Sequence, residues 1–445
     1  MDSFERELWL ADMIDRRRDI HAHPEPGWLE YRTAALVAER LTALGLEVTT
    51  GKRACSSEAR MGVPDAETLR SHEEKALRQG VHPDWVDRMK GGHTAVVGVL
   101  CGARPGPVVA LRFDMDCVEV GETDDPEHLP NKLGFASGQP GVMHACGHDG
   151  HIAIGLGAAE KLAERATELA GEVRFLFQPA EEGCRGARSM VEAGWLDGVN
   201  YLLCGHIGLK SRKLGEIVAS VGGFLSTAKI DAVFRGTAAH AGESPELGSN
   251  ALLAACAAAL HLHGISRHGG GATRVNVGLL EGGTGRNVVP GEARMKLELR
   301  GETEALNAYM VGETSRILEA AAALYGVSCE WETVGCGTSA EGDRSLIPLI
   351  EKECAGMETV GSFIPTLPFG ASEDATFMLR KVQEQGGRGV YMLFGSPLAA
   401  GHHHPSFDFD ERVLGIAAEL LVRLALACPQ WPADTEFPLH TIREE

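Results

Sequence analysis

Short runs of β-branched, aromatic and other apolar residues alternate with helix-forming stretches in the first half of the chain, and this alternation restricts the fold most. Strand-like runs occupy 94–101, 107–113, 172–177 and 201–206, and a helix-forming stretch over 151–171 separates the middle two. Strands that alternate with helices are typical of a mostly parallel sheet covered by helices. The sequence therefore predicts an α/β fold built on a mixed, mostly parallel sheet.

A different pattern begins near residue 221 and continues to about residue 336. It reads as a strand, a helix, two strands, a long helix that stops at Gly326, and a final strand. Such an order is typical of a small α+β sandwich. We therefore predict that 221–336 is a smaller inserted domain, acting as a lid or a dimerisation domain.

A chain of 445 residues exceeds what one hydrophobic core supports. We assign residues 1–220 and 337–445 to one larger domain, because the α/β pattern resumes after the insertion. There, Ser372 is the predicted N-cap of a helix over 373–385. A polar, helix-prone segment at about 56–90 interrupts the first part. It is either a solvated helical surface or a cover over the substrate.

The composition narrows the possible partners. A net charge of -20 argues against a surface for nucleic acid or anionic membrane, which Lys and Arg patches support. The N-terminus lacks the pattern of a signal peptide, and the apolar stretch at 413–428 carries Glu419 and Arg423, so no segment is expected to span a bilayer. Eleven scattered cysteines fit free thiols better than disulfides. We expect a cytoplasmic protein.

The motif MHACGHDGH packs three histidines, one cysteine and one aspartate into nine residues just before a helix. Thiolate and imidazole together suit zinc or another transition metal. Cys146 and His148 alternate, so both can face one side of an extended loop. His144 and Asp149 are expected to orient those ligands from behind. His151 is open between such support and plain packing.

Further chemistry-bearing side chains follow strands. Glu181 and Glu182 come directly after one strand and His206 ends the next, where active sites of α/β proteins collect. One glutamate can ligate a metal while the other accepts a proton. Asp114 also ends a strand, and either orients a metal-bound histidine or caps a loop. The late motif GHHHPSF is expected to supply at least one more ligand.

Ordered motifs from residue 112 to 410 make a family resemblance plain. The chain resembles the metallopeptidase family of carboxypeptidase G, aminoacylase and the indole-acetyl-amino-acid hydrolases. The motifs that carry the resemblance are RFDMD, MHACGHDGH, FQPAEEG, GHIG, GTAAHAGE, GTGRNVVP, SEDATF and the histidine-rich loop. The resemblance implies two divalent transition-metal ions held by Cys146, His148, Glu182, His206 and His403. It makes 1–220 with 337–445 the metal-binding catalytic domain and Glu181 the general base. Manganese is favoured by the resemblance and zinc by the thiolate.

Three residues of the inserted domain are assigned to the substrate. In relatives, the position of His240 supplies a donor to the oxyanion, reaching in from the inserted domain of a second copy. Arg286 and Asn287 are candidates for binding a substrate carboxylate, because a guanidinium matches a carboxylate in two hydrogen bonds. The alternative for His240 is a loop histidine whose hydrogen bonds are satisfied locally. The alternative for Arg286 and Asn287 is that they only form an ordinary turn.

The predicted function is hydrolysis of an N-aroyl or N-acyl amino acid, with aminobenzoyl-glutamate as the leading substrate. A metal-activated water would attack while Glu181 transfers the proton. Alternatives are hydrolysis of another aromatic amide or of an aromatic amine, and a weakly active partner subunit. The expected assembly is a homodimer or a complex with a homologous subunit. Neither a strand-to-helix G-x-G-x-x-G turn nor a P-loop is present, so nothing favours a redox or nucleotide enzyme.

Overall fold

A computed structural model describes residues 3–431 of the chain. Its larger sheet has eight strands in the order β1-β2-β4-β3-β5-β12-β6-β11. Four of the seven strand pairs are parallel and three are antiparallel, which confirms the predicted mixed, mostly parallel sheet. In that order the strands are Glu47–Thr50, Val96–Cys101, Ala170–Gln178, Arg104–Asp114, Tyr201–Ile207, Arg388–Phe394, Glu216–Gly222 and Ser362–Pro368.

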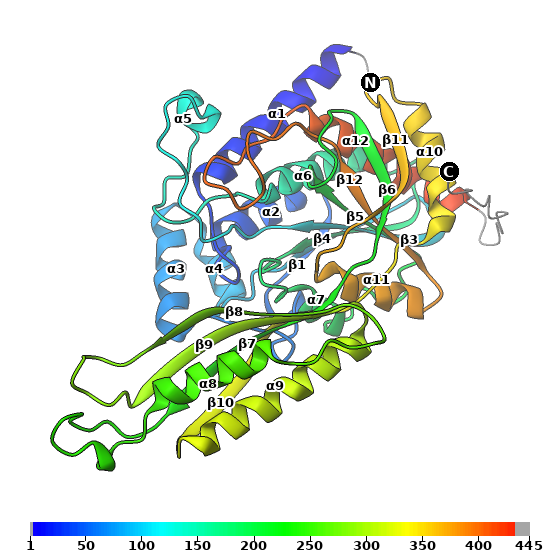
Figure 1. Cartoon of the computed structure of the whole chain (residues 1–445). Coiled ribbons are helices and arrows are strands. Elements are labelled where there is room, and N and C mark those ends of the chain that lie inside the picture. Colours follow the sequence, from blue (N-terminus) through cyan, green and yellow to red (C-terminus); the bar gives the residue numbers. More distant parts are fainter. Residues whose placement is uncertain (1–2, 432–445) are drawn as a thin grey trace.

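Helices cover both faces of this sheet (Figure 1). On one face α6 packs against α1, α2 and α12, and α10 contacts α12; on the other, α11 packs against α7. These helices are α1 (Ser3–Ala22), α2 (Tyr31–Ala43), α6 (His148–Glu164), α7 (Ala187–Glu192), α10 (Ile347–Ala355), α11 (Ala375–Glu384) and α12 (Val413–Ala427). Two separate apolar clusters fill the spaces between sheet and helices, one on each face.

Two glycines let α6 approach its neighbours closely. A Cβ at Gly155 would lie 2.7 Å from the ring of Phe113 on β3, and one at Gly157 would lie 2.4 Å from the sulfur of Met13 on α1. A larger residue would push α6 away from the sheet at position 155 and away from α1 at position 157. Because α6 begins at His148, this packing also fixes the start of the helix at the sheet edge.

Helix α12 tests the expectation about membranes. Within the described residues, Val413–Gln430 is one stretch long and apolar enough to cross a bilayer. However, 61% of that stretch is buried, and α12 packs against α1 and α6. Core helices of this kind are apolar because they are enclosed by protein.

A second sheet of four strands has the order β10-β7-β9-β8, with antiparallel pairs throughout. Its elements follow the predicted order of strand, helix, two strands, helix and strand. They are β7 (Ser226–Arg235), α8 (Ala251–His263), β8 (Thr273–Gly282), β9 (Glu292–Gly301), α9 (Glu304–Leu324) and β10 (Ser328–Gly337). Figure 1 shows α8 and α9 on the side of this sheet that faces away from the larger one.

The segment at about 56–90 is folded. It contains α3 (Ala66–Arg78) and α4 (Pro83–Met89), and both pack against α2. The Asp65 side chain caps α3 by accepting from two backbone amides. The Met61 carbonyl accepts from the indole nitrogen of Trp28 at 2.8 Å, so the start of the segment is fixed to the larger domain. The short helix α5 (Leu129–Leu133) forms a separate projection.

One predicted helix start was wrong. Helix α11 begins at Ala375 with Asp374 as its N-cap residue, not at Ser372. The Ser372 hydroxyl instead donates to the Leu225 carbonyl at 2.8 Å, which ties the helix to the start of the inserted domain.

Candidate metal centre

The predicted ligands meet at the carboxyl edge of the larger sheet. Glu181 and Glu182 follow β4, His206 lies near the end of β5, and His148 begins α6. The loop after β12 carries His403. Strand β3 is parallel to both β4 and β5, and β5 is parallel to β12, so these strands end at one edge. Active sites of α/β sheets form at this edge.

His148 points one ring nitrogen into this site. Its Nδ1 donates to the main-chain carbonyl of Asp116 at 2.7 Å. Its Nε2 is buried without a hydrogen-bond partner, 3.8 Å from Glu181 Oε2 and 4.0 Å from Glu182 Oε1. A buried imidazole nitrogen with no partner costs free energy unless something binds its lone pair. This nitrogen is therefore available to bind a metal ion.

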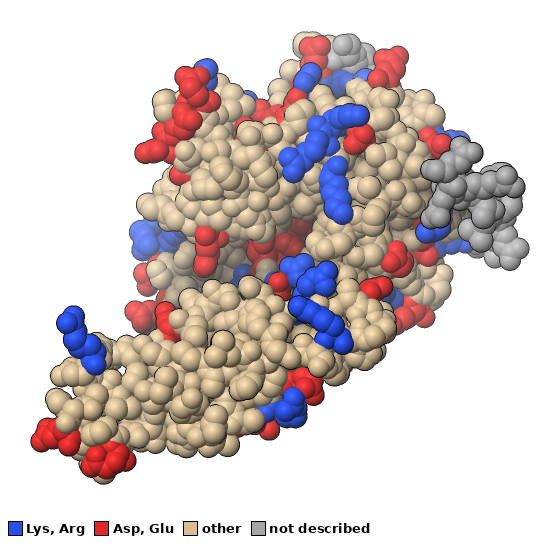
Figure 2. Space-filling view, viewed as in Figure 1, with Lys and Arg blue, Asp and Glu red and all other residues tan. Residues whose placement is uncertain are grey.

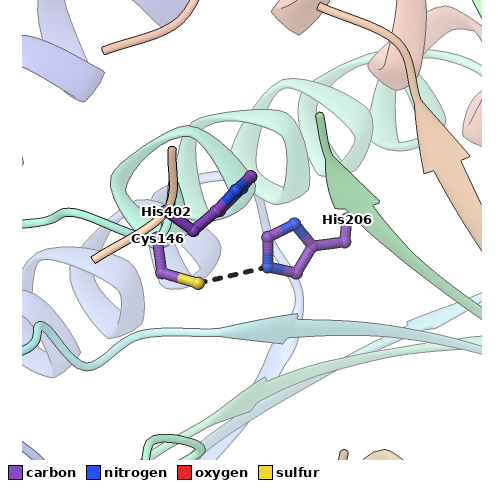
Figure 3. Close-up of side chains that lie close together, drawn as sticks. All are labelled: Cys146, His206 and His402. Carbon is purple, nitrogen blue, oxygen red and sulfur yellow. Dashed lines mark hydrogen bonds between the residues drawn. The ribbon is translucent and has the colours of Figure 1, made fainter. Parts of the chain in front are cut away.

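Cys146 and His206 face each other across the site (Figure 3). The sulfur lies 3.4 Å from His206 Nε2, while His206 Nδ1 donates to the Ile207 carbonyl at 2.8 Å. The Nε2 lone pair is therefore directed at the thiol. The ring of His402 packs against that of His206 with centroids 5.3 Å apart, and potential ligand atoms of all three residues lie within 4.8 Å of one another.

The structure brings two histidines of the late motif to the cluster. His403 Nε2 lies 3.1 Å from Glu182 Oε1, and the His403 amide donates to the Ala145 carbonyl at 2.8 Å. His403 has a left-handed backbone, with φ of 62°, which turns the loop so that successive histidines reach the site. His402, which the sequence did not single out, has its Nε2 3.2 Å from the Ile207 carbonyl. The run of three consecutive histidines in GHHHPSF was the sequence signal that could have identified His402.

The two glutamates stand on a tightly fixed turn. The carboxylate of Asp116 accepts hydrogen bonds from the amides of Glu181 at 2.9 Å and Glu182 at 3.0 Å. Ala180 and Cys184, on either side of the pair, have left-handed φ values of 50° and 58°. Such backbone persists where the surroundings hold it, and it is common at functional sites. Asp116 is thus a site residue that the sequence reasoning missed.

Glu181 sits against further buried acids. Burial, followed by the charges of Glu373 and Glu182, holds its pKa well above the ordinary range. Carboxylate oxygens of Glu181, Glu373 and Asp374 lie within 4.8 Å of one another. Arg112 is buried beside them and donates to Glu373 at 3.1 Å. This guanidinium forms ion pairs with Glu373 and Asp374, whereas no ion pair joins it to Glu181 within residues 3–431.

Asp114 belongs to the same network and contacts His151. Its Oδ1 lies 2.6 Å from His151 Nδ1, and its Oδ2 accepts from Arg112 at 2.7 Å. His151 Nε2 in turn accepts the Ile207 amide at 2.9 Å. Both nitrogens of His151 are therefore used, so it supports the site without ligating, and Asp114 orients His151 rather than any predicted ligand. A catalytic role for Asp114 stays a prediction.

Helix α1 supports the motif from behind. The fully buried Arg17 donates to Asp149 at 2.8 Å and to Asp408 at 2.6 Å. His21 Nδ1 lies 2.8 Å from the same Asp149 oxygen. These contacts fix the first turn of α6 and the loop after β12 to one helix. No local motif near Arg17 or His21 reveals these partners, because the partners are more than 120 residues away.

The donor set fits divalent metal. Burial, followed by the charges of Glu182, Glu181 and Asp114, raises the pKa of the Cys146 thiol well above its ordinary value. So many acidic groups in one buried site need cations close by. Thiolate, imidazole and carboxylate together are ligands that transition metals accept. The buried Nε2 of His148 has no hydrogen-bond partner and is an atom that such an ion would bind, with Glu182 Oε1 4.0 Å from it.

The three predicted substrate residues of the inserted domain lie together on its surface. His240 pairs with Val288 in a short antiparallel bridge, and the Ala241 amide donates to the Asn287 carbonyl at 2.9 Å. His240, Arg286 and Asn287 are exposed. Among the hydrogen bonds and ion pairs of residues 3–431, none joins them to the metal cluster. Their contacts among these residues lie within the inserted domain, and their roles stay predictions.

Three comparisons with known proteins agree. The model of the peptidase family M20/M25/M40 matches residues 110–427. The chain is 46% identical over 430 residues to indole-3-acetyl-aspartic acid hydrolase of Enterobacter agglomerans, covering 96% of this chain and 98% of the relative. It is also 46% identical to one of the subunits of p-aminobenzoyl-glutamate hydrolase from Escherichia coli (strain K12), covering 93% and 95%. An aminobenzoyl-glutamate utilization protein from Klebsiella pneumoniae superposes with a TM-score of 0.80 at 39% identity, covering 95% and 97%.

Proposed function

The chain belongs to peptidase family M20/M25/M40 and is a metal-dependent amide hydrolase, and from that premise we propose that it cleaves N-acyl conjugates of acidic amino acids, aminobenzoyl-glutamate first among them. The two relatives at 46% identity are named for different acyl groups, indoleacetyl and aminobenzoyl. Both are named for an amide of an acidic amino acid. The acidic amino acid that both names share is the observation on which the proposal rests.

The metal site holds two ions in this proposal. Their ligands are Cys146, His148, Glu182, His206 and His403, with His402 beside them. Bound divalent ions would supply the Lewis acid that polarises the amide carbonyl and lowers the pKa of water. The thiolate favours zinc on chemical grounds, and the family resemblance favours manganese.

Glu181 performs the proton transfers in this scheme. Its Oε2 lies 3.8 Å from His148 Nε2, at the edge of the ligand cluster. Burial and the charges of Glu373 and Glu182 raise its pKa, so it holds a proton more strongly than an exposed glutamate does. It would take a proton from the attacking water and deliver it to the leaving nitrogen. The Asp116 carboxylate keeps the Glu181 backbone in place during both transfers.

A direct assay tests the proposal. The purified protein is stripped with a chelator, reloaded with manganese or zinc, and incubated with aminobenzoyl-glutamate while aminobenzoate release is recorded. We expect no turnover without metal and restored turnover with one of the two ions. Turnover of indoleacetyl-aspartate and of N-acetyl-glutamate, measured in the same way, shows which acyl group the enzyme prefers. If the reloaded protein hydrolyses none of these conjugates, the proposed substrate class is wrong.

We also propose assembly through the inserted domain, as a homodimer or with a homologous subunit. Strand β8 is an edge strand of the small sheet, and α8 exposes Leu253 and Leu260, the latter 77% exposed. Exposed leucines beside a free sheet edge are typical of a contact surface. One relative is itself named as part of a larger enzyme. All eleven cysteines are free thiols, which fits our proposal of a cytoplasmic location.

A further inference from the structure

A cavity of about 530 Å³ lies where three parts of the chain meet. One wall is Arg185, on the turn that follows Glu182. A second wall is the four-stranded sheet, on the face that carries Lys229 and Lys296 together with the acidic side chains of Asp231, Glu298 and Glu332. The third wall is Gly62 and Val63 of the folded segment. Figure 2 shows Lys and Arg side chains on the rim of the cleft between the two parts of the molecule, with acidic side chains recessed inside it.

Direct contacts join the cavity walls to the catalytic turn. The Cys336 amide on β10 donates to the Cys184 carbonyl at 2.8 Å, so the inserted sheet is hydrogen-bonded to the turn that bears Glu181 and Glu182. A Cβ at Gly62 would lie 2.8 Å from both Arg185 Cδ and the Val334 carbonyl oxygen. Glycine at position 62 therefore lets the segment approach both other walls.

Arg185 is a half-buried cation without an acidic partner. Its Nε donates to the Glu182 carbonyl at 2.8 Å and its Nη1 to the Gly62 carbonyl at 3.2 Å. Across residues 3–431, no carboxylate forms an ion pair with it, whereas the buried Arg17 and Arg112 each contact three. Carbonyls hold the guanidinium in place but do not cancel its charge. In a chain with a net charge of -20, such a cation stands out as a binding group.

Lys229 adds a second positive charge from the inserted domain. Its Nζ lies 2.7 Å from Glu298 Oε1, but Arg300 also donates to both oxygens of Glu298 at 3.1 Å. One carboxylate is thus shared by two cations. Burial raises the pKa of Cys184, and the Lys229 charge opposes that rise. Lys229 and Arg185 line the same cavity, so Lys229 faces the turn from the opposite wall.

We propose that Arg185, with Lys229 across the cavity, binds the side-chain carboxylate of the substrate's acidic amino acid. The inference rests on the proposed function, because it assigns the second carboxylate of an N-acyl glutamate or aspartate. Arg286 and Asn287 are the predicted partners of a substrate carboxylate, and this inference leaves the α-carboxylate to them. A guanidinium fixed by two carbonyls needs little reordering to bind an anion, which favours affinity and discrimination against neutral side chains.

The test compares aminobenzoyl-glutamate with its glutamine and isoglutamine analogues, which lack the side-chain and the α-carboxylate respectively. Binding is measured by calorimetry on metal-loaded Glu181→Gln protein, so that no substrate is consumed. In that background we expect Arg185→Gln to weaken binding of the glutamate and isoglutamine compounds about 10–100-fold, the usual loss for a charge-assisted hydrogen bond. Binding of the glutamine compound should not change. Lys229→Met should give the same pattern with a smaller loss.

Arg188→Gln is the matched control, because Arg188 is three residues further on and its side chain is 49% exposed. It should leave all three affinities unchanged. An equal loss for all three compounds in Arg185→Gln would mean that Arg185 only holds the turn, and would overturn the inference. A loss confined to the glutamate and glutamine compounds would assign Arg185 to the α-carboxylate and overturn it too. Because binding is measured apart from turnover, a wild-type enzyme that fails to hydrolyse these amides would refute the proposed function alone.

Discussion

The Nδ1 atom of His148 lies 2.7 Å from the main-chain carbonyl oxygen of Asp116, and this contact determines which ring nitrogen faces the ligand cluster. A carbonyl only accepts, so Nδ1 carries a proton and Nε2 is the nitrogen left to bind a metal ion. The carboxylate of Asp116 meanwhile accepts the amides of Glu181 and Glu182. One residue therefore sets both the direction of a predicted ligand and the position of the two glutamates.

Replacing that carboxylate should loosen the site without removing a ligand. We expect Asp116→Asn to lower kcat and metal affinity about 10–100-fold each, the usual cost of losing an outer contact of a metal site. Asparagine keeps the main-chain carbonyl but offers one oxygen where two amides now donate. Metal content after dialysis and kcat at saturating metal measure the two effects, with the exposed Asp124→Asn as control. Wild-type values for both would show that the turn is held without this carboxylate.

Substitutions of the two adjacent glutamates should have different effects on metal content. We expect Glu181→Ala to abolish turnover while metal content stays near that of the wild type, because a proton acceptor contributes nothing to ligation. Glu182→Ala should lose metal as well as activity. Elemental analysis beside the activity assay distinguishes the two roles. Equal metal loss in both variants would contradict this division.

The fold class could be predicted because alternating strands and helices leave few arrangements, and the structure and the comparisons confirm it. The site could be located because parallel strands end at one edge, which gathers Glu182 and His206 there. Local sequence patterns gave wrong predictions where contacts with residues distant in the sequence determine the structure. Asp374, the N-cap residue of α11, has its carboxylate bound from outside the helix, by Gln178 at 2.9 Å and by the Ala187 amide at 2.8 Å. No sequence pattern around Ser372 indicates these contacts.

The contacts that hold the predicted ligands in place also could not be predicted from the sequence. Arg17 is an ordinary helical arginine by sequence, yet it is fully buried between Asp149 and Asp408. The fold brings together residues more than 130 positions apart, so no spacing rule reports the ion pair. The role of Asp116 escaped for a different reason. Its main-chain carbonyl binds His148, and its carboxylate binds the backbone amides of Glu181 and Glu182. A sequence motif describes neither kind of main-chain contact.

Glu30 should make stability depend on pH. Burial, followed by the charge of Asp116, raises its pKa from 4.5 to about 8. The folded state then binds more protons than the unfolded state between those two values, so this group lowers stability as the pH rises from about 4.5 to about 8. Glu30→Gln resembles the protonated form and can still accept the Ala180 amide, which now donates to Glu30 at 2.8 Å.

The variant should therefore match the wild type near pH 5 and exceed its stability near pH 8.5, by an amount on the order of a few kcal/mol. Urea unfolding at the two pH values, on metal-free protein of both forms, measures the difference. Glu39→Gln, exposed on the neighbouring helix α2, is the control and should show no such change. A variant less stable than the wild type at the higher pH would mean that Glu30 is bound as the carboxylate.

The last prediction concerns His240 and a second copy of the chain. His240 is exposed on the inserted domain, and its Nδ1 accepts only the nearby amides of Gly242 and Glu243 among the contacts of residues 3–431. If it acts in the active site of a partner, Glu181→Ala and His240→Ala proteins should each be inactive alone. After mixing and exchange of protomers, half of the dimers would be hybrids with one site that keeps both groups, so about a quarter of the wild-type activity should return. Mass spectrometry of labelled protomers verifies the exchange. No recovery despite complete exchange would place His240 in the site of its own chain, or outside catalysis altogether.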